Sequence, residues 1–367
     1  MERQYSKDLV LKLSEMTQEV SLNGCPVLIK PIPDCDEPGA MDPRVYDASK
    51  GMLRMMRWVP KGLIKFDLSP KGLMKLRAMF NGVKSIPITV KPIDIQSITV
   101  KADDGYEIPI RIYTTSTMGK DLPVLYYIHG GGFFAGHPGV VEESLKLIVE
   151  NFDFPIVSVD YRWAPENPYP IGHQDVYAVY CWITKHAADF HGNPINIFTG
   201  GDSAGGNLAQ YCSTKAFEDK VIPVKGQLLL YSTLNMACVE DAYFHWSLDQ
   251  YEMSKKHKAA ITTSLGMLGN MGTGLNRVLG VSDAHNDYLN PYSRDPKNNP
   301  TTFVAVGEHD YLKVENLAYA AKLHDAGIKT KTLVYKGMGH AFFDQCGIQP
   351  QCEDLALEMG KFIQENA

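Results

Sequence analysis

The pattern of apolar positions changes near residue 92, and from there strand-like and helix-like segments follow one another. Two short segments alternate apolar and polar residues around Asp103, Asp104 and Gly105, which predicts a hairpin over 96–113. Continuous apolar runs then predict strands buried on both faces, at 123–129, 155–160, 195–200, 224–231, 301–307 and 331–337. Helical spacing occupies most of the intervals and the end, at 140–152, 174–190, 204–217, 314–326 and 353–365. This order predicts an α/β fold with a mostly parallel, doubly wound sheet and an antiparallel hairpin at one edge.

Two segments depart from this alternation. Residues 1–90 carry helix signals, including Ser69 before Pro70 as a cap and first-turn pair, with Leu73, Leu76 and Phe80 behind them at helical spacing. Residues 236–285, rich in Met and Gly, interrupt the strand order, and an insertion of this length favours a lid or a substrate wall. The expected division is a helical cap (1–90), a core (91–235), an inserted cap or lid (236–285) and the rest of the core (286–367).

Composition excludes several classes of protein. The 367 residues include 36 Lys+Arg and 42 Asp+Glu, a net charge of −6, and 44% are apolar, as in a globular chain. Without a basic tail, we expect no nucleic-acid partner. Without a long apolar stretch or a signal core, we expect no stable membrane insertion and a cytoplasmic location. The seven cysteines include no CxxC pair and predict reduced thiols, with a Cys346–Cys352 disulfide or a zinc site as the weaker alternatives.

The segment 201–205 reads GDSAG and matches GxSxG between a predicted strand and a predicted helix. A tight strand-to-helix turn with flanking glycines exposes a serine hydroxyl above the sheet, so Ser203 is the candidate nucleophile. The alternative is a helix N-cap serine that happens to lie between glycines.

The segment His129-Gly130-Gly131-Gly132 follows the strand predicted at 123–129. Only a backbone without side chains can turn several N–H groups toward one developing negative oxygen. Gly131 and Gly132, together with Ala204 after the serine, are therefore the candidate oxyanion donors. His129 itself is expected to hold the loop rather than to act as a base.

A serine hydroxyl needs a neutral imidazole to accept its proton and a carboxylate to orient that imidazole. Asp310 and His340 follow the strands predicted at 301–307 and 331–337, so both fall at the same sheet edge as Ser203. Glu308 is a rival for Asp310, and His309 is expected to point away. The other histidines considered as pocket residues, and expected to be structural, are His137 and His285.

Five motifs occur in order: HGGG (129–132), DYRWAPE (160–166), GDSAGG (201–206), GEHDYL (307–312) and GMGHAFF (337–343). Over residues 92–367 they resemble the hormone-sensitive lipase group of α/β hydrolases. The resemblance implies an eight-stranded sheet, an N-terminal helical cap, a serine carboxylester hydrolase and a possible homodimer through the last strand. It gives the roles argued above to Ser203, Asp310 and His340 and to Gly131, Gly132 and Ala204. It also implies that Asp160, Arg162 and Glu166 brace the loops beneath the site.

Two positions depart from that group. Trp163 stands where leucine is usual, and Val314 stands where an acidic residue often follows the catalytic Asp, which removes a charge near the site. The cap matches no motif, so the resemblance does not carry substrate choice.

The sequence thus predicts hydrolysis of small-molecule esters with short to medium acyl chains, with no cofactor and no metal. An amidase or peptidase would use the same residues, and a non-catalytic small-molecule receptor would use the same fold. Residues 50–84 carry nine Lys or Arg and one Asp. They form either a basic lid that attracts anionic esters or acidic surfaces, or an ordinary solvated helix face.

Overall fold

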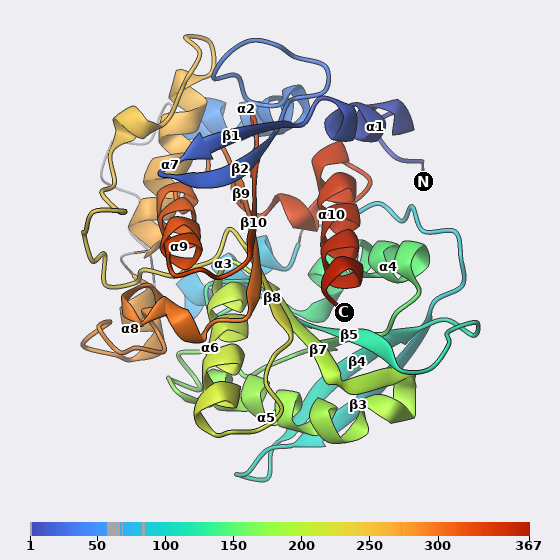
Figure 1. Cartoon of the computed structure of the whole chain (residues 1–367). Helices are drawn as coiled ribbons and strands as arrows, with labels where there is room; N and C mark the ends of the chain where they lie inside the picture. Colours follow the sequence, from blue (N-terminus) through green and yellow to red (C-terminus); the bar gives the residue numbers. More distant parts are fainter. Residues whose placement is uncertain (1, 57–66, 68, 83–84, 273) are drawn as a thin grey trace.

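The computed structural model describes the whole chain except residues 1, 57–66, 68, 83, 84 and 273. A sheet of ten strands crosses the middle of the molecule in the order β1-β2-β10-β9-β8-β7-β5-β6-β4-β3 (Figure 1). The strands are β1 (Gln18–Leu22), β2 (Cys25–Lys30), β3 (Asp94–Lys101), β4 (Glu107–Thr114), β5 (Leu122–Ile128), β6 (Ile156–Val159), β7 (Gly192–Asp202), β8 (Gly226–Leu230), β9 (Thr301–Gly307) and β10 (Thr330–Tyr335). The pairs formed by β5 to β10 among themselves are parallel, whereas β3 pairs antiparallel with β4, and β4 with β6. The predicted α/β fold, with an antiparallel hairpin at one edge, is confirmed.

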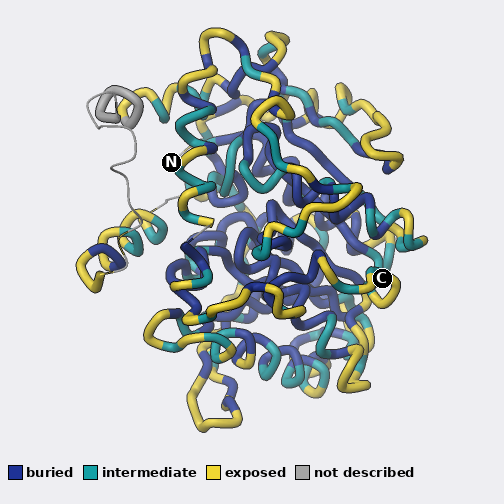
Figure 2. The backbone as a smooth tube through the Cα atoms, turned by 90° about the vertical axis from the view of Figure 1, so that its left-hand side faces the viewer, coloured by how far each residue is buried: buried dark blue, intermediate teal, exposed yellow. Residues whose placement is uncertain are grey.

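Helices cover both faces of the sheet. Those of the core are α4 (Pro138–Phe152), α5 (Ile171–His186), α6 (Ala204–Glu218), α9 (Lys313–Asp325) and α10 (Pro350–Asn366). Figure 1 shows α4 and α10 on one side of the sheet and α5, α6 and α9 on the other. Buried residues follow the central strands and exposed residues follow the outer turns (Figure 2). The strands β5, β7, β9 and β10 are therefore fixed from two sides, and their carboxyl ends make a rigid base for loops.

The first two strands are a hairpin that the sequence analysis missed, so the sheet has ten strands rather than the eight that the resemblance implies. Asn23 and Gly24 form its two-residue turn, with φ angles of 52° and 77°. Strand β2 pairs in parallel with β10, and Lys30 at its end is buried and bound to Asp354 and Glu358 of α10, at 3.1 Å from each. Residues 18–30 are thus part of the sheet and not of a helical cap.

The hairpin also changes the expected dimer. Strand β10 has β9 on one side and β2 on the other. A second chain cannot pair with an edge that is already hydrogen-bonded, so the implied dimer through the last strand is not open to this structure.

The remaining helices are α1 (Lys7–Glu15), α2 (Pro43–Met56), α3 (Pro70–Phe80), α7 (Lys258–Gly272) and α8 (Leu275–Leu279). The start predicted for α3 is confirmed, because the Ser69 hydroxyl accepts from the Gly72 N–H at the first turn. None of the helices in the described part of the chain has the length and apolar character that crossing a membrane requires.

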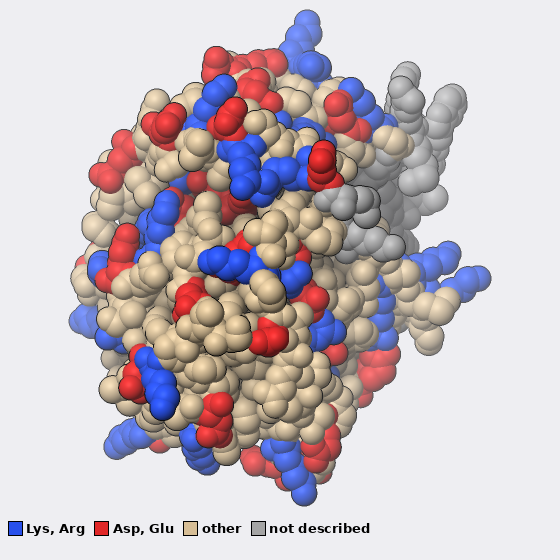
Figure 3. All heavy atoms as spheres, turned by 90° about the vertical axis from the view of Figure 1, so that its right-hand side faces the viewer, with Lys and Arg blue, Asp and Glu red and all other residues tan. Residues whose placement is uncertain are grey.

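The charge pattern bears on the expected partners. Part of the predicted basic segment, including Arg57, Lys61, Lys65 and Lys84, lies outside the described residues. On the face shown in Figure 3, basic and acidic side chains are intermingled rather than gathered by sign.

Candidate active site

Ser203 stands on the tight turn between β7 and α6. Its φ is 53°, a left-handed value that is rare outside glycine and that marks a strained turn. Glycine is required beside it, because a Cβ on Gly205 would lie 2.1 Å from the Ile128 carbonyl oxygen. The GxSxG pattern therefore allows α6 to begin directly against the end of β5.

Three side chains predicted from the sequence meet in one hydrogen-bonded chain. His340 Nε2 lies 2.9 Å from Ser203 Oγ, and His340 Nδ1 lies 2.8 Å from Asp310 Oδ2. The loops after β9 and β10 supply Asp310 and His340, and the Asp310 side chain is fully buried. The second carboxylate oxygen of Asp310 accepts from the Leu312 N–H at 2.9 Å, which fixes the rotation of the carboxylate. A serine, an imidazole and a carboxylate in this order can transfer a proton away from the hydroxyl.

The charges around His340 favour its protonated form. Burial alone would lower its pKa, but the charge of Asp310 and their hydrogen bond, with smaller contributions from Asp202 and Glu315, raise the pKa above the ordinary histidine value. The imidazole is therefore a stronger base than a free histidine.

Glu315 is a residue of the site that the sequence analysis missed. It is buried, and its carboxylate accepts from the Leu234 N–H at 2.7 Å and from the Asn235 N–H at 3.3 Å. Burial raises its pKa to about 7. The acidic side chain that position 314 lacks is thus present at the next residue, and an acidic residue in the first turn of α9 was the available signal.

The glycine loop lies beside Ser203 because β5 and β7 are neighbours, with Ile128 opposite Gly201. Gly131 and Gly132 have φ angles of 116° and 61°, and a Cβ on Gly131 would lie 2.1 Å from the Ala135 carbonyl oxygen. The buried carboxylate of Asp202 joins the loop to the serine turn.

Asp202 connects the glycine loop to the serine turn through one carboxylate oxygen. Its Oδ1 accepts from the Gly130 N–H and from the Tyr127 hydroxyl, each at 3.0 Å. Burial raises the pKa of Asp202 to about 6. Residue 202, directly before the nucleophile, therefore ties the start of the glycine loop to the turn that carries Ser203.

The rival residues lie elsewhere. Glu308 accepts from Lys336 Nζ at 2.5 Å and from the Gly337 N–H at 2.9 Å. His309 points away, with Nε2 3.0 Å from the Glu252 carbonyl oxygen. The interpretation that favoured Asp310 over Glu308 agrees with these contacts.

The remaining histidines considered above have structural surroundings. His129 is buried against the Tyr161 ring, with ring centres 4.5 Å apart, and burial lowers its pKa to about 4. His137 caps α4 by accepting from the Gly139 N–H, and His285 is exposed beside Asp283.

Residues 125–344 match a family profile described as alpha/beta hydrolase fold. The chain belongs to the α/β hydrolase family. Carboxylesterase NlhH of Mycobacterium tuberculosis is 28% identical over 296 residues, which cover 76% of this chain and 85% of the relative. The versiconal hemiacetal acetate esterase of Dothistroma septosporum is also 28% identical, over 73% of this chain and 81% of its own.

Solved structures agree with this α/β hydrolase. The carboxylesterase EstE1 from a metagenomic library has a TM-score of 0.66 at 25% identity, covering 81% of this chain and 97% of its own. An esterase from Pyrobaculum calidifontis matches in fold, with a TM-score of 0.71 at 22% identity over 89% of this chain and all of its own. The predicted hormone-sensitive lipase group and its class, a serine carboxylester hydrolase, are confirmed.

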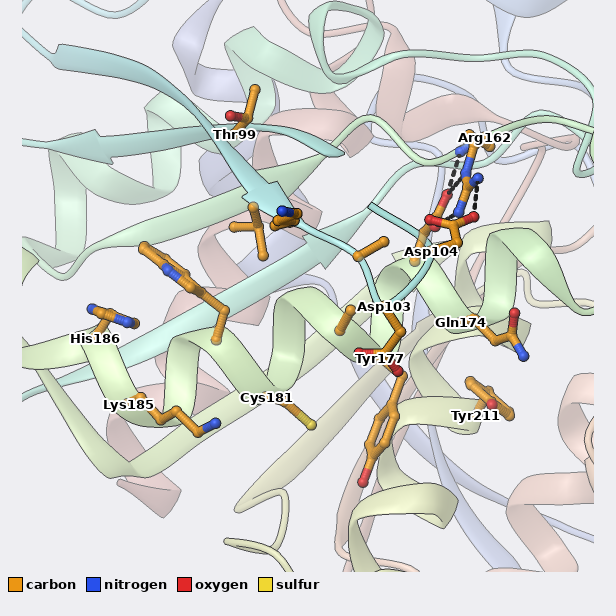
Figure 4. A pocket seen from close by; sticks show the side chains of 16 residues that line it. Thr99, Asp103, Asp104, Arg162, Gln174, Tyr177, Cys181, Lys185, His186 and Tyr211 are labelled. Carbon is orange, nitrogen blue, oxygen red and sulfur yellow. Dashed lines mark hydrogen bonds and ion pairs between the residues drawn. The ribbon is translucent and has the colours of Figure 1, made fainter. Parts of the chain in front are cut away.

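The 160–166 motif of this α/β hydrolase contacts the edge hairpin, α5 and the glycine loop. Figure 4 shows Arg162 at one end of a cleft of about 670 Å³ between α5 and the β3–β4 turn. Its guanidinium binds Asp175 at 2.6 Å on one side and Asp104 at 2.6 Å on the other. Tyr161 donates its hydroxyl proton to the His129 carbonyl oxygen at 3.2 Å. The motif therefore joins the edge hairpin and α5 to the loop that carries the glycines.

Proposed function

We propose that Ser203 is the nucleophile of this ester hydrolase, His340 its general acid–base and Asp310 the carboxylate that orients His340. The observation that carries the proposal is the unbroken hydrogen-bond chain, with 2.9 Å from serine to imidazole and 2.8 Å from imidazole to carboxylate. Both distances lie within the range that proton transfer from the nucleophile needs.

The reaction proceeds in two balanced halves. Ser203 Oγ forms a bond to the ester carbonyl carbon while its proton moves to His340 Nε2, and the N–H groups of Gly131, Gly132 and Ala204 hold the resulting oxyanion. The bond from that carbon to the alcohol oxygen then breaks, and the alcohol leaves with the proton from His340. A water molecule attacks the acyl-serine with its proton going to His340, and the acid departs as Ser203 recovers its proton.

We expect acyl chains of short to medium length. The support comes from α8 of the inserted segment, which lies over the glycine loop: a Cβ on Gly132 would stand 3.4 Å from a methyl group of Leu275. Leu275, Val278 and Leu279 are buried in the hydrophobic core, so α8 is packed against the rest of the protein and bounds the space over the glycine loop. A series of p-nitrophenyl esters from acetate to palmitate tests the limit, and equal kcat/KM across the series would contradict it.

We propose that residues 236–285 and the helices of the first 90 residues together form a cap.

We also propose a cytoplasmic location. Supporting the location, all seven cysteines are free thiols, including Cys346 and Cys352. Cell fractionation checks the location, and a protein recovered only outside the cytoplasm would contradict it.

Labelling with a fluorophosphonate tests the chemistry. We expect wild-type protein to bind one label at Ser203, and Ser203→Ala to lose both the label and the ester turnover. Turnover equal to wild type in Ser203→Ala would exclude the proposed nucleophile. A matched amide hydrolysed as fast as the ester would favour an amidase, and wild-type protein that is neither labelled nor active would favour a receptor.

A further inference from the structure

Helix α3 of the N-terminal region reaches the back of the glycine loop through Arg77. The Arg77 Nε–H donates to the Phe134 carbonyl oxygen at 2.7 Å, and Nη2 donates to the Ala164 carbonyl oxygen at 3.2 Å. These carbonyls belong to two backbone segments that are hydrogen-bonded to each other, because the Ala164 N–H donates to the Phe133 carbonyl oxygen at 2.9 Å. The Arg77 guanidinium therefore joins α3 to both backbone segments.

The guanidinium is itself held on two sides. Glu166 accepts from Nη1 and Nη2 at 2.8 and 2.6 Å, and the Trp163 ring centre lies 5.1 Å from the guanidinium carbon. Trp163 stands where the resemblance expects leucine, and an aromatic ring attracts a cation in a way that leucine cannot. The unusual residue of the 160–166 motif thus contacts the side chain that reaches across from α3.

A second pair of contacts from α3 fixes the far end of the same loop. The Asn81 side-chain oxygen accepts from the Gly136 N–H at 2.8 Å. The Phe80 ring packs edge-on against the Phe134 ring, with centres 5.5 Å apart. The end of α3 therefore contacts this segment at the Phe134 side chain and at the Gly136 backbone N–H.

Residues 134 and 135 in turn bind the oxyanion glycines. The N–H groups of Phe134 and Ala135 both donate to the Gly131 carbonyl oxygen, at 3.1 and 2.9 Å. A shift of residue 134 therefore turns the peptide that joins Gly131 to Gly132 and moves the Gly132 N–H, which lies in the same plane. Donors of this kind act only when they point at the place where the oxyanion forms.

We propose that Arg77 is a positioning residue for the oxyanion loop, that Trp163 is the surface that holds its guanidinium, and that the loop has its working shape only while α3 is docked. The inference rests on the oxyanion roles proposed above for Gly131 and Gly132. Arginine suits the task because its rigid fork presents donors in two directions at once, whereas a lysine ammonium on a flexible stem cannot hold both carbonyls in that geometry.

The test compares Arg77→Lys and Arg77→Met with wild type on a short p-nitrophenyl ester. We expect kcat to fall about 10-fold with KM within about two-fold, because complete loss of one oxyanion donor lowers kcat roughly 10²- to 10³-fold and a misplaced donor keeps part of its effect. Trp163→Leu should show a smaller loss of the same kind, and the loss in Arg77→Met/Trp163→Leu should be less than the product of the two single losses.

Arg294 provides a matched control. It binds Glu218 at 2.6 Å and lies 5.7 Å from the Tyr288 ring centre, so it repeats the arrangement of cation, carboxylate and ring away from the glycine loop. Arg294→Lys should leave kcat within about two-fold of wild type.

Two readouts separate positioning from loss of fold. Fluorophosphonate titration counts active sites, so kcat is expressed per site, and the affinity for a boronic acid that mimics the tetrahedral state should fall in parallel with kcat. Unchanged kcat per titrated site in both Arg77 variants would overturn this inference alone. A wild-type protein that titrates no serine would overturn the proposed function instead. Because Arg77→Lys keeps the charge and the stem, it serves as the test if Arg77→Met does not fold.

Discussion

Tyr251 joins the inserted segment to the loop that carries Asp310. Its hydroxyl group donates to the carbonyl oxygens of Asp310 and Tyr311, at 3.0 and 3.1 Å, and the side chain is buried. The same stretch of the insert receives two more contacts from that loop, from Lys313 to the Gln250 carbonyl and from His309 to the Glu252 carbonyl. Residues 250–252 thus form a clamp on the Asp310 loop, and not only a wall for substrate.

Changing Tyr251 to Phe removes the hydroxyl and little else. The ring keeps its place beside Trp246, 6.0 Å away, and beneath the Lys313 ammonium at 4.1 Å. The Tyr311 carbonyl then loses its donor in a partly buried place, whereas the Asp310 carbonyl still accepts from the Lys313 N–H at 3.1 Å. Loss of the donor to a buried carbonyl costs about 1–3 kcal/mol. We therefore expect the free energy of unfolding to fall by about 1–3 kcal/mol. We also expect kcat to fall a few-fold, because the freed peptide also sets the Leu312 N–H that fixes the Asp310 carboxylate.

Urea unfolding of Tyr251→Phe beside Tyr243→Phe measures the effect. Tyr243 belongs to the same inserted segment, but its hydroxyl binds Asp325 in an exposed position, so its loss should leave the urea midpoint close to that of wild type. Equal unfolding midpoints for Tyr251→Phe and wild type, together with equal kcat, would refute the clamp. A loss of stability with unchanged kcat would refute only its link to Asp310.

Three further predictions follow from single contacts. kcat/KM should rise with pH through one ionisation that lies above the ordinary histidine value, because His340 must lose a proton that Asp310 helps it to hold; a pH profile with its midpoint below that value would contradict this. Gly131→Ala should lower ester turnover more than 10²-fold, since its Cβ would meet the Ala135 carbonyl oxygen at 2.1 Å, and wild-type turnover would contradict the assigned loop geometry. Lys30→Met should lower the free energy of unfolding by about 3–5 kcal/mol, because it leaves the buried Asp354 and Glu358 without a shared cation; a urea midpoint near that of wild type would contradict it.

The core of the fold could be predicted because its signals are local. Each strand from β5 to β10 is a short apolar run with helical spacing next to it, and the rules of connection fix most of the order. The β1–β2 hairpin shows the limit of this reasoning. Its turn, Asn23-Gly24, is a strong hairpin signal, but β1 is exposed along its whole length and Lys30 buries a charge where a strand pattern expects an apolar residue. Strand β10, with which β2 pairs, lies some 300 residues away in the chain, so no local pattern predicts this pairing.

The candidate site could be predicted for a different reason. Ser203, Asp310 and His340 each follow a buried strand, and the carboxyl ends of parallel strands meet at one edge, so residue type and strand order together bring them close. Glu315 and Tyr251 act through backbone groups of distant segments, Leu234 in one case and Asp310 in the other. Such contacts depend on how segments far apart in the chain are brought together in the fold, and no residue spacing in the sequence predicts this.

The departure from the family pattern at Trp163 is explained by the residues that contact it in the structure. Trp163, taken alone, is a large residue where a smaller one is usual, and it suggests a loosened loop. Beside Arg77 it provides the face of a ring for a cation that also binds two backbone carbonyls and Glu166. Without Trp163 the Arg77 guanidinium would keep its hydrogen bonds but lose the face of the ring, and without Arg77 the ring would lose its cation. The effects of replacing the two residues should therefore be coupled. If the α3 region is exchanged for that of a relative with leucine at the matching position, Trp163→Leu should raise the ester turnover of the chimera, and an unchanged or lower turnover would contradict the coupling.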